Sequence, residues 1–150
     1  MRRGRIWISP GFLLLTALFL FWDREGVAPV VLIAWALHEG GHLGVLWAAG
    51  GRLRRLELSL VGIKIETQQG RRLTYGGELL AVLAGPGANL ALAALCARLG
   101  ESWYLFSGVS LILGVFNLLP LPGLDGWRVM ELFCSLLQEE GKRVKKMKKK

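Results

Sequence analysis

The sequence predicts an all-α polytopic membrane protein with about four transmembrane helices, a small β-hairpin or sheet at the cytoplasmic face and a short C-terminal interfacial helix. Three observations support this fold class. Hydrophobic residues make up 53% of the 150-residue chain, and the mean hydropathy is positive, at +0.42. The formal net charge is nevertheless +8, and apolar and basic residues are segregated along the chain. The length indicates a single domain over residues 1–150.

The composition excludes several other classes of protein. A disordered or nucleic-acid-binding basic chain would be poor in Leu, Val and Phe, whereas leucines dominate whole stretches of this chain. We therefore expect no nucleic-acid partner. The two cysteines, Cys96 and Cys134, are too few for a disulfide-stapled scaffold and match no CxxC pattern of a metal or redox site.

Four apolar segments are long enough to cross a bilayer, which takes roughly 17–25 residues of a helix. We expect transmembrane helices at about residues 6–22, 27–50, 79–99 and 102–121. The first segment ends in Leu20-Phe21-Trp22, without the small residues that signal peptidase needs, so we expect a retained anchor. A shorter apolar segment at residues 126–138 predicts an interfacial helix.

The basic residues predict the orientation of the chain in the membrane. Most Lys and Arg lie at the N-terminus, between the second and third segments, and in a basic tail at residues 141–150. Because basic loops stay in the cytoplasm, we expect a multi-pass protein of the cell membrane with both termini cytoplasmic. The lipid bilayer surrounds such a protein, and the tail is either a solvated end or a contact for anionic lipids.

Residues 53–75 are the sizeable segment without a helical pattern. Apolar and polar residues alternate from Leu56 to Leu60 and again from Ile63 to Glu66, and this period of two is typical of β-strands. Val61-Gly62 interrupts the alternation, and residues 68–72 form a polar turn. We therefore expect a hairpin or a two-stranded sheet at the cytoplasmic surface of the membrane.

The second apolar segment contains the pattern His38-Glu39-Gly40-Gly41-His42. Residues four apart on a helix face the same way, so both imidazoles can reach one metal ion while Glu39 lies beside a water molecule. Two His ligands with a neighbouring Glu are typical of hydrolytic zinc sites. In the alternative, the histidines only hydrogen-bond neighbouring helices. That alternative leaves Glu39 unexplained, because a carboxylate inside an apolar span is costly and needs a role.

The two glycines of this pattern leave two uses open. Gly40 and Gly41 weaken the helix, and they allow either the close approach of a neighbouring helix or substrate, or ordinary packing of small residues. A helix rises about 1.5 Å per residue, which places His42 roughly 12 Å and His38 roughly 18 Å below the cytoplasmic end of the helix. A metal ion there would lie within the bilayer.

A tetrahedral zinc site with two His ligands and a water needs one more protein ligand. Asp125 follows an uncharged run in which Pro120 and Pro122 would break the fourth helix. Broken backbone at membrane depth is tolerated where it lines a cavity or is buried in protein, so the break can turn Asp125 back toward the histidines. In the alternative, Asp125 caps a helix that begins at Gly126. We favour the ligand because both motifs are present.

Three motifs follow one another between about residues 30 and 130. They are HExxH at His38–His42, Gly-Pro-x-x-Asn at Gly85–Asn89, and Asn-x-x-Pro followed by Asp-Gly at Asn117–Gly126. In this order they resemble the site-2 proteases, membrane-embedded zinc metalloproteases that cut substrates within or next to their transmembrane helices. The chain most resembles the small subgroup that contains the sporulation protease of a sigma-factor precursor.

The resemblance implies a role for each matching residue. His38, His42 and Asp125 would bind one zinc ion per chain, and Glu39 would activate the water. Asn117 is implicated in holding the substrate, whereas Asn89 could bind substrate or form a contact between helices. The strand region at residues 53–66 would pair with an extended peptide by strand addition.

The resulting expectation is an intramembrane zinc metalloendopeptidase that hydrolyses membrane-associated proteins near the cytoplasmic face, in regulated intramembrane proteolysis. Its partners would be a membrane protein substrate and a regulatory membrane protein. Because the chain has no room for a PDZ or CBS domain, regulation would come either from the membrane core itself or from such a partner. The subgroup implies a bacterial plasma membrane. A metal-binding membrane transporter and a catalytically silent membrane scaffold are the alternatives.

Overall fold

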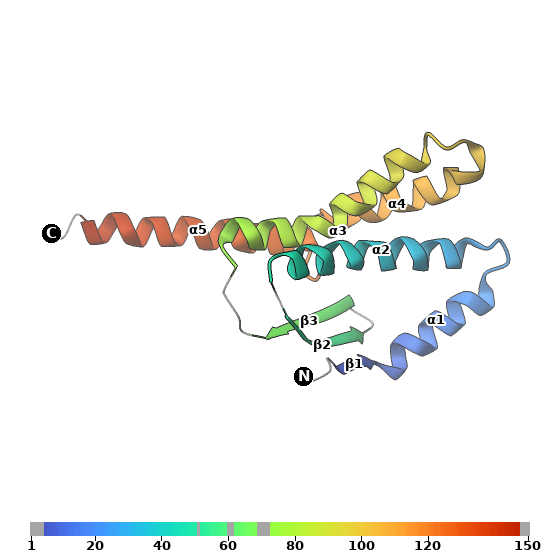
Figure 1. Cartoon of the computed structure of the whole chain (residues 1–150), viewed down its shortest axis with the longest axis horizontal. Coiled ribbons are helices and arrows are strands. Elements are labelled where there is room, and N and C mark those ends of the chain that lie inside the picture. Colours follow the sequence, from blue (N-terminus) through green and yellow to red (C-terminus); the bar gives the residue numbers. More distant parts are fainter. Residues whose placement is uncertain (1–4, 51, 60–61, 69–72, 148–150) are drawn as a thin grey trace.

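Three helices, α2, α3 and α4, form the centre of the structure (Figure 1). They span Val27–Ala48, Tyr75–Cys96 and Tyr104–Asn117, and a short 3-10 helix at Glu101–Trp103 joins α3 to α4. The computed structural model describes the backbone of residues 5–50, 52–59, 62–68 and 73–147, and the side chains of residues 8–50, 73–139 and 141. The α3 helix packs against both α2 and α4, and α2 also contacts α4.

Two further helices flank this centre. The α1 helix, Pro10–Trp22, diverges from α2, with which it makes few contacts (Figure 1). The α5 helix, Asp125–Met147, packs against α3 and continues beyond its start (Figure 1). Between α1 and α2, the carboxylate of Asp23 accepts hydrogen bonds from the backbone N–H groups of Val27 and Ala28, at 3.0 and 2.9 Å. This contact provides acceptors for two of the N–H groups that are free at the start of α2.

The first and third helices begin elsewhere than the hydropathy pattern predicts. The first begins at Pro10 and not at residue 6, because Ser9 caps it and proline suits the first helical position. The third begins at Tyr75 and not at residue 79, because the Thr74 hydroxyl accepts a hydrogen bond from the N–H of Gly77 at 3.2 Å.

The last two helices differ from the prediction at their ends. The α4 helix stops at Asn117 and not at residue 121, shortly before the two prolines. The α5 helix continues to Met147, whereas the prediction ended it at residue 138. Lys, Arg and Glu are good helix formers, so most of the expected basic tail is helical, and the short interfacial helix was wrong in its length. Lys148–Lys150 and Arg2–Arg3 lie outside the described residues.

A three-stranded sheet lies beside the helices, in the strand order β1-β2-β3 (Figure 1). The strands are Arg5–Ile8, Arg52–Ser59 and Gly62–Gln68. β2 and β3 are antiparallel and lie in the segment where strands were expected, with Leu56 opposite Ile65 and Leu58 opposite Ile63. β1 pairs with β2 in parallel; these residues were expected to begin the first helix. Of the expected polar turn, residues 69–72 lie outside the described residues.

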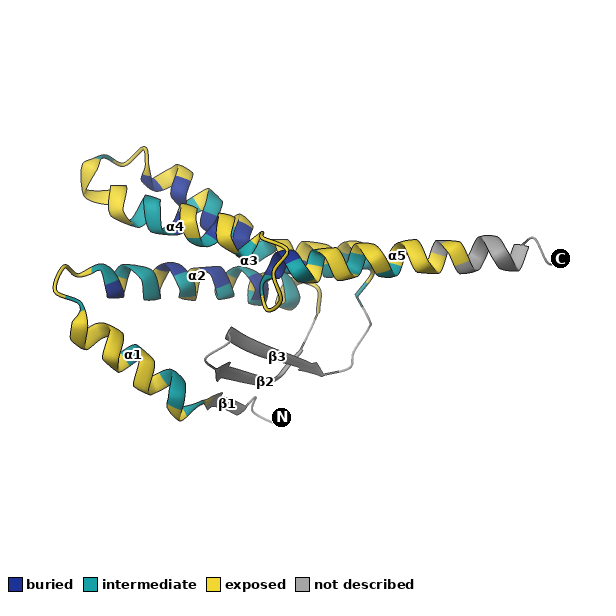
Figure 2. Ribbon diagram, turned by 180° about the vertical axis from the view of Figure 1, so that it is seen from behind, coloured by how far each residue is buried: buried dark blue, intermediate teal, exposed yellow. Residues whose placement is uncertain are grey.

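Small residues fill the interior of the helix bundle, and many large apolar side chains are exposed. Figure 2 shows buried positions on α2, α3 and α4, whereas the positions on α1 are exposed or intermediate. The buried apolar side chains are Ala28, Ala34, Ala81, Ala93 and Cys96. In contrast, α1 has no buried residue, and large side chains such as Phe21 and Trp47 are exposed. Small residues at helix contacts are typical of membrane proteins, in which large apolar side chains face lipid. In water, so much exposed apolar surface would be a liability.

Two of the described helices, α2 and α3, are long and apolar enough to cross a membrane, and α1 is a shorter apolar helix. The mostly helical structure and these two helices are consistent with a membrane protein. Because only α2 and α3 meet the length and hydropathy criteria among the described residues, four spans stay a prediction.

The two adjacent glycines of α2, Gly40 and Gly41, have different environments because only one of them faces α3. A Cβ atom at Gly41 would lie 2.5 Å from the backbone oxygen of Ala84, whereas a Cβ atom at Gly40 would meet nothing within 4 Å. Gly41 therefore allows α3 to approach α2, and Gly40 faces open space. The approach matters for the site because both helices contribute to it.

We expect Gly41→Ala to lower the free energy of unfolding by about 1–3 kcal/mol, because the added methyl group forces α2 and α3 apart. Gly40→Ala is the matched control and should be neutral, or stabilising by up to about 1 kcal/mol, because alanine favours the helix. Unfolding in detergent micelles, followed by tryptophan fluorescence, measures both changes. Equal effects of the two substitutions would contradict the packing described above.

Candidate metal centre

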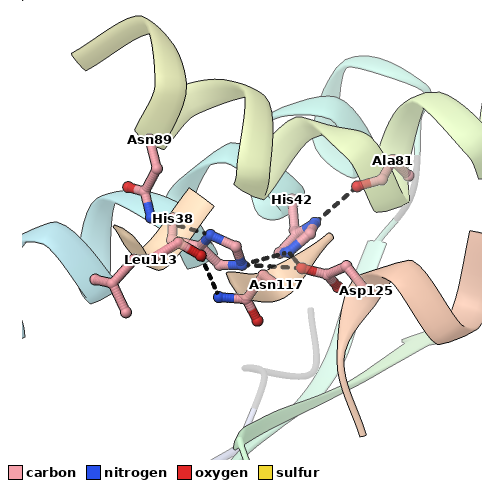
Figure 3. Close-up of polar contacts among 7 residues, drawn as sticks. All are labelled: His38, His42, Ala81, Asn89, Leu113, Asn117 and Asp125. Carbon is pink, nitrogen blue, oxygen red and sulfur yellow. Dashed lines mark hydrogen bonds and ion pairs between the residues drawn. The ribbon is translucent and has the colours of Figure 1, made fainter. Parts of the chain in front are cut away.

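Three side chains that could bind a metal ion meet where α2, α3 and the start of α5 come together (Figure 3). His38 and His42 lie one turn apart on α2, and Asp125 is the first residue of α5. The Asp125 Oδ2 atom is 3.0 Å from His38 Nε2 and 3.2 Å from His42 Nε2. The two Nε2 atoms are 3.2 Å apart, and all three residues are buried.

The chain between α4 and α5 brings Asp125 to this position. After α4 ends, residues 118–124 form an irregular connection in which Gly123 has a φ angle of 96°, a conformation that favours glycine. At Gly126, a Cβ atom would overlap the backbone oxygen of Leu118. The start of α5 therefore packs directly on the end of α4. Asp125 begins a helix and contacts both histidines, so the two alternatives considered for it are compatible.

The arrangement of the three donor atoms fits a divalent metal ion. Ligand distances of roughly 2.0–2.2 Å at a tetrahedral centre imply separations of roughly 3.3–3.6 Å between neighbouring ligand atoms. The three separations of 3.0, 3.2 and 3.2 Å are close to this range. Two imidazole nitrogens and one carboxylate oxygen also form a donor set that transition metals prefer. Small outward shifts of the side chains would accommodate the ion.

The α3 helix orients the His42 imidazole without contributing a metal ligand. His42 Nδ1 lies 2.7 Å from the backbone oxygen of Ala81. Because a carbonyl oxygen only accepts, Nδ1 must carry the proton and donate it. The Nε2 atom of the neutral ring is then unprotonated and faces His38 and Asp125. A hydrogen bond of this kind is the usual way in which a metal-binding histidine is held in one tautomer.

Gly85 of α3 leaves the space that the two imidazoles occupy. A Cβ atom at this position would overlap His42 Nε2 and would lie 2.8 Å from His38 Nε2. Pro86, the next residue, is fully buried. The Gly-Pro-x-x-Asn motif therefore has a physical role at its first position, where any side chain would displace the donor atoms. The motif is visible in the sequence, but the role of Gly85 becomes clear only from the short distance between α2 and α3.

Glu39 follows His38 on α2 and is half-buried. Among the described residues, the group of close potential metal ligands consists of His38, His42 and Asp125, without Glu39. Glu39 nevertheless lies beside this group, because it is the next residue after His38 on α2. The position is suitable for a group that exchanges protons with a molecule at the centre while leaving the metal to other ligands.

The two asparagines singled out in the sequence occupy different environments. Asn117 is the last residue of α4 and half-buried, and its Nδ2 donates to the backbone oxygen of Leu113 at 2.9 Å. Asn89 is fully buried on α3, with its Nδ2 atom 3.2 Å from His38 Nδ1 (Figure 3). Burial of Asn89 favours a contact within the protein over a contact with substrate. Asn117 keeps partial access to molecules outside.

Two comparisons with known proteins found a similarity. The model of Peptidase family M50 matches residues 97–149. The solved structure of the site-2 protease from Methanocaldococcus jannaschii is similar, with a TM-score of 0.66 and 21% sequence identity. The similarity covers 90% of this chain and 70% of that chain. None of the curated proteins matches the sequence.

The structural likeness shows that the two chains share a fold. The family model matches the part of the chain from residue 97 to residue 149. In the structure, the group of His38, His42 and Asp125 could bind a metal ion.

We expect Gly85→Ala to abolish most of the metal binding, because the new methyl group occupies the space of the imidazole donor atoms. The matched control is Gly87→Ala in the same helix, where a Cβ atom meets nothing within 4 Å. Calorimetric titration of the detergent-solubilised protein with Zn²⁺ measures the affinity, and circular dichroism verifies that the helices are retained. The geometry would be contradicted if Gly85→Ala bound the ion as tightly as Gly87→Ala.

Proposed function

We propose that the protein is an intramembrane zinc metalloendopeptidase. It hydrolyses peptide bonds of membrane-associated proteins within or next to a transmembrane segment, near the cytoplasmic face. The observation that supports this most strongly is the convergence of His38, His42 and Asp125, with Glu39 at the adjacent position of α2. The match to Peptidase family M50 supports the same class of reaction.

His38 Nε2, His42 Nε2 and Asp125 Oδ2 would hold the zinc ion, one per chain. When bound, zinc supplies a Lewis acid that polarises a carbonyl group and makes water more acidic. Imidazole and carboxylate ligands suit this metal. The remaining steps belong to the protein side chains.

Glu39 is the proposed catalytic base. Its carboxylate takes a proton from the attacking water and later gives that proton to the amine that leaves when the peptide bond breaks. This role requires a carboxylate next to the metal site but outside its ligand set, and the half-buried position of Glu39 meets both conditions. A metal transporter would need the ligands but would have no use for this base.

Asn117 is the proposed substrate-binding residue. One of its two amide protons is donated to the backbone oxygen of Leu113, which fixes the orientation of the side chain. The carbonyl Oδ1 and the second N–H proton then remain for the substrate. They could bind the backbone of an extended peptide or stabilise the negative charge that develops on the carbonyl under attack.

The sheet is the proposed docking site for the substrate, because a transmembrane helix must unwind before its peptide bonds can be attacked. The strand order limits which edge can bind the extended peptide. β2 is central, with β1 on one side and β3 on the other. Within the predicted region at residues 53–66, strand addition is therefore open only at the outer edge of β3.

The membrane setting of this function has several parts. The exposed large apolar side chains support a lipid bilayer as the surroundings. We propose a multi-pass arrangement with both termini in the cytoplasm, and a membrane protein as substrate. We also propose a regulatory membrane protein as a partner, and a bacterial plasma membrane from the resemblance of the motifs to the sporulation subgroup.

We expect Glu39→Gln to reduce hydrolysis by about 10²–10⁴-fold, because the amide cannot accept the proton of the attacking water. Bound zinc should stay near one ion per chain, since Glu39 lies outside the ligand set. The matched control is Glu131→Gln, at an exposed Glu of α5 that accepts a hydrogen bond from Trp127.

Synthetic single-span peptides in detergent, analysed by mass spectrometry, measure the cleavage. A Glu39→Gln variant that cleaves like the native chain would contradict the role of this residue. Zinc transport into vesicles by the native chain and by Glu39→Gln alike, without hydrolysis, would favour the transporter.

A further inference from the structure

A buried amide lies behind His38, on the opposite side of the imidazole ring from the metal-binding nitrogen. Asn89 Nδ2 is 3.2 Å from His38 Nδ1, while His38 Nε2 faces Asp125 at 3.0 Å (Figure 3). Asn89 is 0% exposed, and its Oδ1 atom has no hydrogen-bond partner among the described residues. Because Oδ1 and Nδ2 of an amide can exchange places, the atom that faces His38 has to be assigned from the hydrogen-bonding needs of the imidazole.

The protonation of the imidazole makes this assignment. A neutral ring carries one proton, and a ring that binds a metal ion through Nε2 carries that proton on Nδ1. Nδ1 must then donate, and its neighbour must accept. Rotation of the Asn89 amide by 180° exchanges Oδ1 and Nδ2 in nearly the same space. The rotated amide therefore presents the unpartnered oxygen to the Nδ1–H group of His38.

We propose that Asn89 is a positioning residue whose Oδ1 accepts a hydrogen bond from His38 Nδ1–H and keeps His38 Nε2 free for the metal ion. The proposal rests on the proposed function, because it requires a metal ion at this centre. It replaces the expectation that Asn89 binds substrate. The full burial of the amide leaves no path to a substrate, and its contact is with a metal ligand.

Both histidines are then oriented in the same way, because α3 provides a hydrogen-bond acceptor for the Nδ1–H group of each ring. Ala81 provides its backbone oxygen to His42 Nδ1 at 2.7 Å, and Asn89 provides its side-chain oxygen to His38. Gly85 lies between them and leaves space for both rings. These three residues are spaced four apart, so they form one stripe along α3. The helix contributes no ligand but orients both imidazoles.

The acceptor at Asn89 must come from a side chain, and this makes it testable by substitution. Asn89→Leu has nearly the same shape and no acceptor, whereas Asn89→Asp keeps an acceptor at the same distance. Loss of an acceptor behind a metal-binding histidine typically weakens metal binding by about 10–100-fold. We expect Asn89→Leu to bind Zn²⁺ that much more weakly and Asn89→Asp to bind it within a few-fold of the native chain.

Competition with a chromogenic zinc chelator in detergent measures these affinities. The proposal is overturned if Asn89→Leu binds Zn²⁺ as tightly as the native chain, or if Asn89→Asp binds it as weakly as Asn89→Leu. A residue that only packs between helices would give the first result, because leucine keeps the shape of the asparagine side chain. A substrate-binding residue would also give the first, with a change only in KM.

Nuclear magnetic resonance of ring-15N-labelled histidine tests the hydrogen bond first in the native chain, where the result does not depend on the folding of a variant. The chain has two histidines, and its spectrum therefore contains only two imidazoles. In the zinc-loaded protein we expect a proton on Nδ1 of both rings, each protected from exchange with water. In Asn89→Leu, the His38 proton should exchange rapidly while the His42 proton stays protected.

Failure of this inference is distinguishable from failure of the proposed function. A native chain that binds no Zn²⁺ would refute both. A native chain that binds Zn²⁺ with His38 coordinated through Nδ1, or with an unprotected Nδ1 proton, would refute the role of Asn89 alone.

Discussion

The burial of two imidazoles and a carboxylate in an apolar helix bundle is the constraint on which the rest of the structure depends. Such groups are costly at membrane depth unless they are paired or bind a metal ion. His38, His42 and Asp125 meet within 3.0–3.2 Å of one another, although Asp125 lies far along the chain. The irregular connection before α5 makes this contact possible, because a continuous α4 would carry Asp125 away from the histidines.

Small residues allow the helices to surround these polar groups closely. Gly41 lets α3 approach α2, and Gly85 leaves space for the imidazole rings. Large apolar side chains are then displaced to the outer surface, where lipid can solvate them. The packing that suits a membrane is therefore the same packing that forms the site. This packing also strengthens the electrostatic interactions of the proposed base, Glu39, because such interactions are stronger where water is excluded.

The spacing of residues in the sequence predicts the three candidate metal ligands. It does not predict the residues of α3 that surround and orient the histidines. The i, i+4 spacing of the two histidines and the prolines before Asp125 are local signals in the sequence. The structure brings His38, His42 and Asp125 together. The role of Gly85 and the environment of Asn89 depend on how closely two helices approach, which no local pattern records. The pairing of β1 with β2 is likewise long-range. The length of α5 was missed because hydropathy falls near residue 138, although the basic residues beyond it favour a helix.

The metal content of the purified chain in detergent tests the central claim most directly. The native chain should bind about one zinc ion, and His38→Ala and Asp125→Ala should each lose most of it, because each removes one of three protein ligands. An Asp125→Ala variant that keeps its zinc would contradict the three-ligand site and the meaning given to the break before α5. A native chain without affinity for metal would contradict the enzyme altogether and favour a silent membrane scaffold.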